Sequence, residues 1–344
     1  MFEPTYRITP FLISCLEQIS SRKVFIDQVG KKSPLKVNIA RDSFNRSIHS
    51  STGIEGNMLS LAQVAALSAD KSIVGEEKQK LEVKNCIKAL RWVLQHKMSV
   101  FNEERLLRLH AFMTKGLLPK ERCGQYRHIQ NYIVNAKHQV IFTPRPPSKV
   151  KPGIKDLFVW LKQHRREHPI IRSAVFHHEF AGIHPFVDGN GRVARAAAQW
   201  ILFHEGYDPI WTLGLDEFYA QDRKKYYDMI QQTHDMDHDY THWIEYIAQG
   251  LLEAIRTVSR RIKEETHRQK QNVFTPKQNE LLKLLEKNGV MGSAKIRKHM
   301  NINRARVNQL IAPLVKAGLV IKEGTTRAVK YSLNKIYFES SSLW

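Results

Sequence analysis

HPFVDGNGRVAR (184–195) is the stretch that decides the fold, because it lies between two helical patterns rich in apolar residues. IRSAVFHHEFAGI (171–183) precedes it, and VARAAAQWILFH (193–204) overlaps its end and continues the second helix. The segment GNG (189–191) stands where that second helix begins. Unpaired backbone N–H groups at a helix N-terminus favour anions, and glycine lets a ligand approach the backbone closely. The sequence therefore predicts a phosphate-binding helix start.

The side chains around this helix start have the types that phosphoryl or nucleotidyl transfer needs. Arg192 and Arg195 are one helical turn apart and can each donate two hydrogen bonds to phosphate oxygens. Asp188 offers a carboxylate to Mg²⁺, which commonly bridges carboxylates and substrate phosphates. His184 has an ordinary pKa of about 6.5, suited to taking a proton from a hydroxyl. The expected site is the base His184, the metal ligand Asp188, and the phosphate-binding residues Gly189, Asn190, Gly191, Arg192 and Arg195.

The composition is that of a globular protein with a large basic excess. The 344 residues include 54 Lys and Arg against 33 Asp and Glu, a formal net charge of +21. This composition excludes a collagen-like or disordered chain and favours polyanionic partners. Three widely spaced cysteines without a CxxC pair exclude a disulfide framework and predict a reducing compartment. No signal-peptide pattern and no run of 18 apolar residues occurs, so we expect a cytoplasmic protein that does not bind a membrane.

Helical periodicity dominates the first three quarters of the chain. One interruption, NYIVNAKHQVIFTPRPP (131–147), has two β-branched runs around a polar centre and predicts a short exposed hairpin. We therefore expect a mainly α protein with an N-terminal helical region (1–95), a catalytic core (96–255), a solvated connector (256–272) and a C-terminal domain (273–344). The expected helices of the first three regions are 59–67, 81–94, 106–118, 154–164, 171–183, 191–205, 217–232 and 240–262.

The C-terminal domain, 273–344, has its own pattern. Three helical stretches are followed by alternating apolar and polar residues around a Glu-Gly turn at 323–324, an order typical of a winged helix-turn-helix. Nine Lys and four Arg against four acids give it a charge of +9. Residue types that contact base edges begin the third helix, and types that suit backbone phosphates lie on the expected wing: Asn303, Arg304, Arg306, Asn308 and Gln309, then Thr325, Thr326, Arg327 and Lys330. Duplex DNA binding and protein docking both stay open for this domain.

HPFVDGNGRVAR also resembles the signature of the Fic family, HxFx(D/E)GN(G/K)RxxR, at every specified position. GQYR (124–127), the 131–146 hairpin and the tyrosine pair 226–227 are similar to the family's pre-motif loop, flap and nucleotide-bordering helix. The resemblance covers about residues 40–255. It implies the Fic fold, a helical bundle with a β-hairpin flap, with Phe186 anchoring the motif loop in the core. It also implies a protein adenylyltransferase, a nucleotidyltransferase that moves AMP from ATP, with Mg²⁺, to a Ser, Thr or Tyr hydroxyl of a target protein and of itself.

A second resemblance lies upstream, where SSTGIEGN (50–57) is similar to the inhibitory (S/T)xxxE(G/N) element of Fic proteins, with Ser51, Glu55 and Gly56 at the specified positions. A carboxylate paired with Arg195 would compete with the γ-phosphate of ATP, so the resemblance implies autoinhibition by Glu55. Two other functions stay open: predominant removal of AMP from a modified target, and a DNA-binding regulator whose Fic domain senses nucleotide. A homodimer is compatible with the sequence.

Overall fold

The computed structural model describes residues 2–28, 34–134, 139–236, 239–271, 275–316, 319–324 and 329–334. The chain forms two compact units, the first made of Met1–Phe25 and Ala40–Val258 and the second of Ile26–Ile39 and Ser259–Trp344. Among the described residues, no helix has both the length and the apolar content needed to cross a bilayer. Each unit is described separately below.

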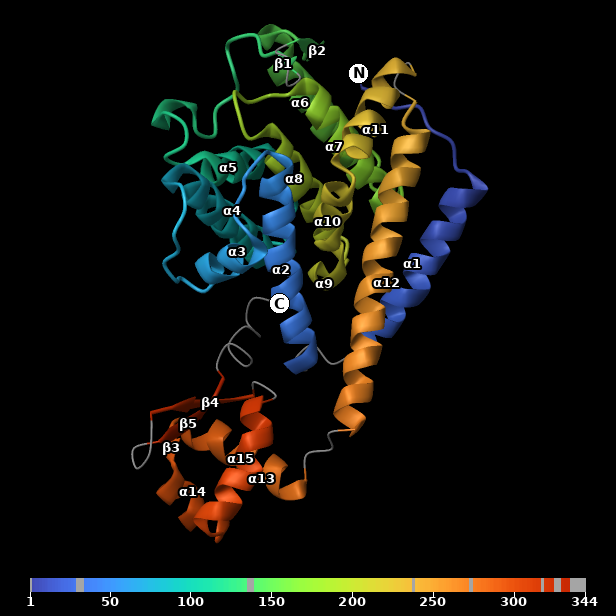
Figure 1. The fold of residues 1–344 in the computed structure, drawn as a ribbon. Coiled ribbons are helices and arrows are strands. Elements are labelled where there is room, and N and C mark those ends of the chain that lie inside the picture. The colour runs from blue at the N-terminus through green and yellow to red at the C-terminus, as the bar shows by residue number, and fades with distance from the viewer. Residues whose placement is uncertain are drawn as a thin grey trace. The chain divides into compact units, whose positions relative to one another are not determined.

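Helices make up most of the first unit, as the sequence predicts (Figure 1). Two short strands, β1 (Ile133–Val134) and β2 (Val140–Phe142), pair antiparallel at the expected hairpin, whose residues 135–138 lie outside the described ones. The helices that lie wholly or partly in this unit are α1 (Pro10–Gln28), α2 (Pro34–Ile54), α3 (Leu61–Ser68), α4 (Glu77–Gln95), α5 (Glu103–Thr114), η1 (Lys120–Arg122), α6 (Pro147–Gln163), α7 (Pro169–Ile183), α8 (Asn190–His204), α9 (Pro209–Thr212), α10 (Gly214–Gln221), α11 (Arg223–Asp235) and α12 (Thr241–Gln271).

The helix α8 lies in the core of this unit and packs against α7, α5 and α4 (Figure 1). Every residue from Arg192 to Phe203 is buried, which is typical of a helix enclosed on all sides. Alanines at 194, 196, 197 and 198 let α7 approach closely, and Ser173 Oγ of α7 donates a hydrogen bond to the Ala198 carbonyl (2.8 Å). Six residues join α7 to α8, so this packing fixes the position of the motif loop, residues 184–189.

Two expected helices differ from the observed ones in instructive ways. The predicted helix 217–232 is two helices, α10 and α11, because the backbone leaves the helical region at Asp222 (φ −137°, ψ 77°). The Asp222 carboxylate accepts a hydrogen bond from the Lys225 N–H (2.9 Å) and starts α11 as its N-cap. The last helix, α12, continues to Gln271, so residues 256–271, expected as a connector, are helical.

Besides the ends of α1, α2 and α12, the described residues of the second unit form the helices α13 (Pro276–Asn288), α14 (Ser293–Met300) and α15 (Arg304–Lys316) and the strands β3 (Met291–Gly292), β4 (Val320–Glu323) and β5 (Lys330–Leu333). The strands form one antiparallel sheet in the order β3-β5-β4. A core of buried side chains, among them Leu281, Ile296, Val307 and Leu314, joins helices and sheet. Pro313 lies inside α15 without ending it. The assignment as a winged helix-turn-helix stays a prediction, and Thr325, Thr326 and Arg327 of the expected wing lie outside the described residues.

Candidate active site

Phe186 fixes the motif loop in the core of the first unit. Its ring is fully buried and stacks on the His110 imidazole of α5, with centroids 3.7 Å apart and planes 4° from parallel. The Asn190 amide at the start of α8 closes the loop, because it accepts from the Phe186 N–H (2.9 Å) and donates to the Phe186 carbonyl (2.8 Å). The loop between α7 and α8 is therefore held from inside.

Arg127 and Asn131, from the segment that leads into the β1–β2 hairpin, hold the same loop from outside. Arg127 Nε donates to the His184 carbonyl (2.8 Å), and its other nitrogens reach the Ile129 and Arg145 carbonyls. Asn131 Nδ2 donates to the Phe186 carbonyl (2.9 Å). The backbone on which His184 stands is thus fixed by at least two polar side chains of the preceding segment.

His184 ends α7 in the left-handed conformation (φ 51°, ψ 60°), a strained position for a residue with a side chain. Its Nδ1 lies 3.3 Å from the Ala181 carbonyl, which fixes a proton on Nδ1 and leaves Nε2 as the proton acceptor. Burial lowers the pKa of His184 below its usual 6.5, and the nearby charge of Arg127 lowers it further. The imidazole is therefore neutral at pH 7, as a general base must be.

Gly191 lies in the first turn of α8, and the Glu55 carboxylate is seated directly against it. A Cβ at position 191 would overlap Glu55 Oε1, so only glycine admits this approach. The carboxylate thus occupies the N-terminal end of α8, where free N–H groups and the positive end of the helix dipole stabilise negative charge. This arrangement shows that the helix start predicted to bind phosphate accommodates an anion.

Arg195, one turn further along α8, is fully buried and surrounded by hydrogen-bond acceptors. Its Nη2 donates to Glu55 Oε1 (2.8 Å) and to the Ser51 carbonyl (2.8 Å), and its Nε donates to Ser51 Oγ (3.0 Å). The carboxylate of Asp216, also buried, lies 3.9 Å from Nε. Burial by itself lowers the pKa of Arg195, but the negative groups around it, Glu55 first, raise it overall. Arg195 is therefore permanently charged, and its partners come from the end of α2, from Glu55 directly after it, and from Asp216 of α10.

Gly56 makes the placement of Glu55 possible. It has a φ of 98°, in the left-handed region, immediately after α2 ends. The Asn57 N–H donates back to the Thr52 carbonyl (3.1 Å), and the Gly56 N–H donates to the Gly53 carbonyl (3.0 Å). Helix ends of this kind need glycine or asparagine at the left-handed position, which gives the E(G/N) pattern a physical cause. The turn is tied to α4 as well, because Asn57 Nδ2 donates to Glu82 Oε2 (2.7 Å).

Arg192, the first arginine of the motif, has a different set of partners. Its side chain is almost completely buried, and Nη1 pairs with Glu82 Oε1 of α4 (2.6 Å). Nη2 lies 3.4 Å from Asp188 Oδ2. The two arginines that the sequence places on one face are thus held by carboxylates from two different segments, Glu82 of α4 for Arg192 and Glu55, directly after α2, for Arg195.

Asp188 is the expected metal ligand, and its side chain is more than half exposed. One carboxylate oxygen accepts from the Gly189 N–H (2.6 Å), and Gly189 itself has a φ of 81° that favours glycine. Within the described residues, no group of three or more His, Cys, Asp or Glu side chains forms a metal cluster. A single exposed carboxylate fits a Mg²⁺ that takes its remaining ligands from nucleotide phosphates and water.

Three residues of the site were not found from the sequence: Glu82, His110 and Asp216. Glu82 and Asp216 are single acids among many charged residues of helical segments, and nothing in their spacing marks them. His110 carried a signal, since it stands on the apolar face of LLRLHAFM (106–113). Burial lowers its pKa to about 4, so its ring packs neutral against Phe186.

The tyrosine pair expected to border a nucleotide divides between core and surface. Tyr226 is buried, and its hydroxyl lies 3.0 Å from His177 Nε2. Tyr227 is 42% exposed and lies under the Arg223 guanidinium. Burial raises the pKa of both phenols. Only Tyr227 is therefore accessible to a ligand without rearrangement.

The chain is similar to known proteins in sequence and in fold. Residues 100–202, which include the motif loop and most of α8, match the model of the Fic/DOC family. Curated relatives include the protein adenylyltransferase Fic of Aedes aegypti, 26% identical over 235 residues that cover 64% of this chain and 43% of the relative. That of Culex quinquefasciatus is 28% identical over 211 residues, 57% of this chain and 38% of the relative. The chain spans less than half the length of these relatives.

Solved structures give the fold. A Fic family protein from Desulfovibrio desulfuricans G20 superposes with a TM-score of 0.69 over 97% of this chain and 98% of its own, at 24% identity. Fic-1 (residues 134–508) from C. elegans superposes with a TM-score of 0.60 over 74% of this chain and 72% of its own, at 24% identity. The mainly helical fold predicted from the sequence is confirmed: this chain has the fold of the Fic proteins of known structure.

Proposed function

We propose that this protein transfers AMP from ATP to a hydroxyl group of a protein target and of itself, and that Glu55 restrains the reaction. One observation carries the proposal: the Glu55 carboxylate sits against Gly191 at the start of α8 and pairs with Arg195, where a phosphate would bind. The match of residues 100–202 to the Fic/DOC family and the relatives named protein adenylyltransferase support it.

His184 carries the proton transfer in this proposal. Its Nε2 takes the proton of the target hydroxyl as the hydroxyl oxygen bonds to the α-phosphorus of ATP. The bond from that phosphorus to the α,β-bridging oxygen breaks, and pyrophosphate leaves with the electron pair. The products are the AMP ester of the target, pyrophosphate and the proton on His184. The fixed Nδ1 proton keeps Nε2 free for this step.

The residues of α8 would bind the phosphates. The N–H groups at Asn190 and Gly191 would form the anion hole together with Gly189, whose own N–H binds Asp188 in this structure. Arg192 and Arg195 would neutralise the outer phosphates. When bound, Mg²⁺ neutralises phosphate charge and so supports departure of pyrophosphate. Asp188 would hold it, because its exposed carboxylate has the hard oxygen donors that Mg²⁺ prefers.

Autoinhibition follows from the same contacts. With Arg195 paired to Glu55, the γ-phosphate lacks its cation and ATP lacks the orientation in which hydroxyl and leaving group are in line. Misorientation of reacting groups removes a large part of catalysis, so loss of the Glu55 carboxylate should increase transfer. Ser51 belongs to the same restraint because it also accepts hydrogen bonds from Arg195.

Hydrolytic removal of AMP from a modified target is the alternative. The Glu55 side chain is 29% exposed and its charge acts on both Arg195 and His184, so it could position a water molecule beside a bound AMP ester. Incubating AMP-modified target with the wild type separates the two activities. Release of AMP faster than its attachment would make removal the main reaction.

The donor experiment tests the proposal directly. Glu55→Gly protein is incubated with Mg²⁺ and ATP labelled at either the α- or the γ-phosphate. We expect protein to be labelled from the α-phosphate alone, and Glu55→Gly/His184→Ala protein to stay unlabelled. Labelling from the γ-phosphate alone would make the protein a kinase and would overturn the proposal.

A further inference from the structure

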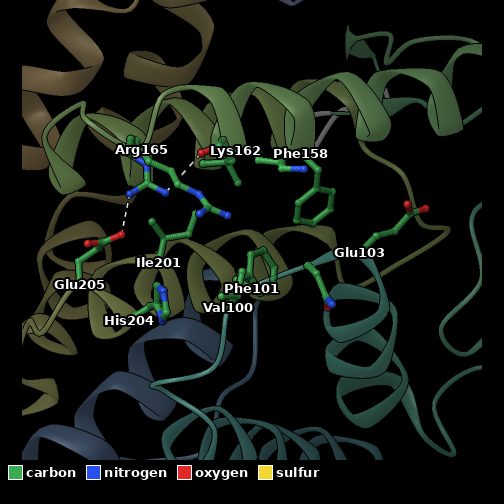
Figure 2. Close-up of a pocket in the computed structure, with 12 residues that line it drawn as sticks. Val100, Phe101, Glu103, Phe158, Lys162, Arg165, Ile201, His204 and Glu205 are labelled. Atoms are coloured by element: carbon green, nitrogen blue, oxygen red, sulfur yellow. Dashed lines mark hydrogen bonds and ion pairs between the residues drawn. The ribbon is translucent and has the colours of Figure 1, made fainter.

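A cavity of about 470 Å³ lies at the C-terminal end of α8, at the opposite end of that helix from the candidate active site (Figure 2). α8 has 15 residues, so its two ends are about 20 Å apart at about 1.5 Å per residue. All lining residues belong to the first unit. Small-molecule sites commonly have volumes of about 300–1,000 Å³, so the cavity can enclose a small organic molecule.

One side of the cavity is an apolar wall formed by Phe101, Phe158 and Ile201. Phe101 is buried, and its ring packs on Phe158 (5.6 Å between centroids) and on Trp200 of α8 (5.4 Å). Trp200 Nε1 in turn donates to the Ser99 carbonyl (3.2 Å) and ties the 99–101 segment to α8. The wall is therefore formed before a ligand arrives, which lowers the entropy cost of binding.

The acids that line the cavity already have partners. Glu205 pairs with Arg172 Nη1 (2.7 Å), and Glu103 accepts from the Tyr126 hydroxyl (2.9 Å). Lys162 follows Phe158 by one turn of α6, Arg165 lies just beyond the end of that helix, and both side chains are exposed at the cavity (Figure 2). In the part of the chain that the structure describes, neither makes a hydrogen bond or an ion pair.

The helix dipoles at the cavity do not cancel the positive charge of Lys162 and Arg165. α6 and α8 both end at the cavity, and each C-terminus carries the equivalent of about half a negative charge. Lys162 and Arg165 together carry two full positive charges. The helix ends therefore offset only about half of this positive charge, and no side chain of the described lining pairs with Lys162 or Arg165.

We propose that this cavity binds a small organic anion. The aromatic or branched aliphatic body of the ligand lies against Phe101, Phe158 and Ile201, and its carboxylate, sulfonate or phosphate group is bound by Lys162 and Arg165. Burial of the body and charge-assisted hydrogen bonds to the head supply the affinity. The site is separate from the proposed AMP-transfer site and does not depend on it.

Fluorescence titration with two probes tests this site. Anilinonaphthalene sulfonate has an aromatic body and an anionic group, and N-phenylnaphthylamine is the same ring system without the charge. We expect Lys162→Ala/Arg165→Ala to weaken sulfonate binding at least about tenfold, because two charge-assisted hydrogen bonds are lost, and to change the affinity of the uncharged probe less than about twofold.

Lys155→Ala/Arg166→Ala is the matched control. It removes the same two charges from neighbouring exposed positions that do not line the cavity, and should leave both affinities unchanged. Val100→Trp, at an exposed position on the rim, should weaken both probes by filling the cavity. Equal sulfonate affinity in the wild type and Lys162→Ala/Arg165→Ala, or no binding to the wild type, would overturn the proposal. So would unchanged binding of both probes to a folded Val100→Trp protein.

Discussion

The helices α8 and α15 each carry two arginines near their N-terminus, but one pair is buried and the other is exposed. Arg192 and Arg195 of α8 are 3% and 2% exposed and are held by Glu82 of α4 and by Glu55, which directly follows α2. Arg304 and Arg306 of α15 are exposed, and the Arg306 guanidinium donates to the neighbouring Gln309 (3.0 Å). The same sequence feature thus gives an internal ion-pair network in one unit and a solvated cationic surface in the other.

The difference arises from what surrounds each helix. A buried guanidinium is costly unless carboxylates and hydrogen-bond acceptors compensate its lost hydration, so α8 must recruit Glu82, Glu55 and Asp216. An exposed arginine keeps its hydration and is available to a polyanion. Buried arginines therefore indicate a site in which the protein's own carboxylates determine whether the positive charge is available to a ligand. Exposed arginines indicate a surface that can bind a polyanion from solution.

The largest expected effect tests whether the residues at the N-terminal end of α8 catalyse AMP transfer. In the Glu55→Gly background, His184→Ala should lower AMP transfer by about 10²–10⁴-fold, because the general base is lost. ATP affinity, measured by calorimetry, should change little, since in the proposed reaction His184 acts on the target hydroxyl and does not bind the nucleotide. His164→Ala, at the half-buried end of α6, is the control and should keep full activity. A parallel loss of ATP affinity and rate in His184→Ala would make His184 a nucleotide ligand instead.

A second substitution compares the two arginine pairs in stability. Glu82→Ala leaves Arg192 buried without its 2.6 Å partner and should lower the free energy of unfolding by about 3 kcal/mol. Arg306→Ala on the surface of α15 should change it by less than about 0.5 kcal/mol. Urea denaturation of both variants gives the two values. Equal values would show that pairing with Glu82 stabilises the protein no more than an exposed arginine does. That result would contradict the difference between the two arginine pairs.

The salt dependence of DNA binding tests the exposed pair, Arg304 and Arg306. We predict that the full chain binds duplex DNA, with an affinity that falls as salt rises. Arg304→Ala/Arg306→Ala should reduce the slope of log affinity against log salt by about 2, since each phosphate contact contributes about 0.9. Lys277→Ala/Lys283→Ala on α13 removes the same charge and should leave the slope nearer the wild-type value. No binding by the full chain at low salt would favour protein docking for this domain.

The smallest expected effect is a shift in pH dependence. In the proposed reaction the neutral imidazole of His184 is the active form, and burial lowers its pKa below 6.5. The rate should therefore be maximal at pH 7 and fall only as the pH drops through that lowered pKa. The Glu55 carboxylate raises this pKa, so Glu55→Gly should move the acid limb to lower pH than in the wild type. An acid limb above pH 6.5 in both proteins would contradict a buried base.

The sequence predicted the helical class, the hairpin and the motif loop, because glycine spacing and helical periodicity are local properties. It did not predict α2, although its buried residues Val37, Ala40, Phe44 and Ile48 follow a helical period. Polar residues outnumber the apolar ones in this stretch, NIARDSFNRSIHSS (38–51), so its mean hydropathy is low and the period is hidden. As a result, the sequence indicates SSTGIEGN as a motif but does not predict α2, the helix that positions it beside Arg195.

The partners of the motif arginines could not be predicted, for a different reason. The packing of α4 on α8 brings Glu82 to Arg192, and the position of α10 brings Asp216 to Arg195. In each pair the two residues are more than 20 positions apart in the sequence. A single sequence holds many acids at comparable spacing, and only tertiary structure selects these two. The pairing of Glu55 with Arg195, in contrast, was expected from the resemblance to the inhibitory element, and the structure places the two side chains 2.8 Å apart.

The central claim is that Glu55 controls Arg195, and a double-mutant cycle of AMP transfer tests it most directly. Incorporation of α-phosphate label is measured for the wild type, Glu55→Gly, Arg195→Ala and the double variant, with ATP binding and Tm as controls. We expect Glu55→Gly to increase transfer at least about tenfold, and the increase to vanish in the Arg195→Ala background, because the carboxylate acts through that arginine. A folded Glu55→Gly protein that binds ATP and is no more active than the wild type would contradict the claim, and so would an equal increase in both backgrounds.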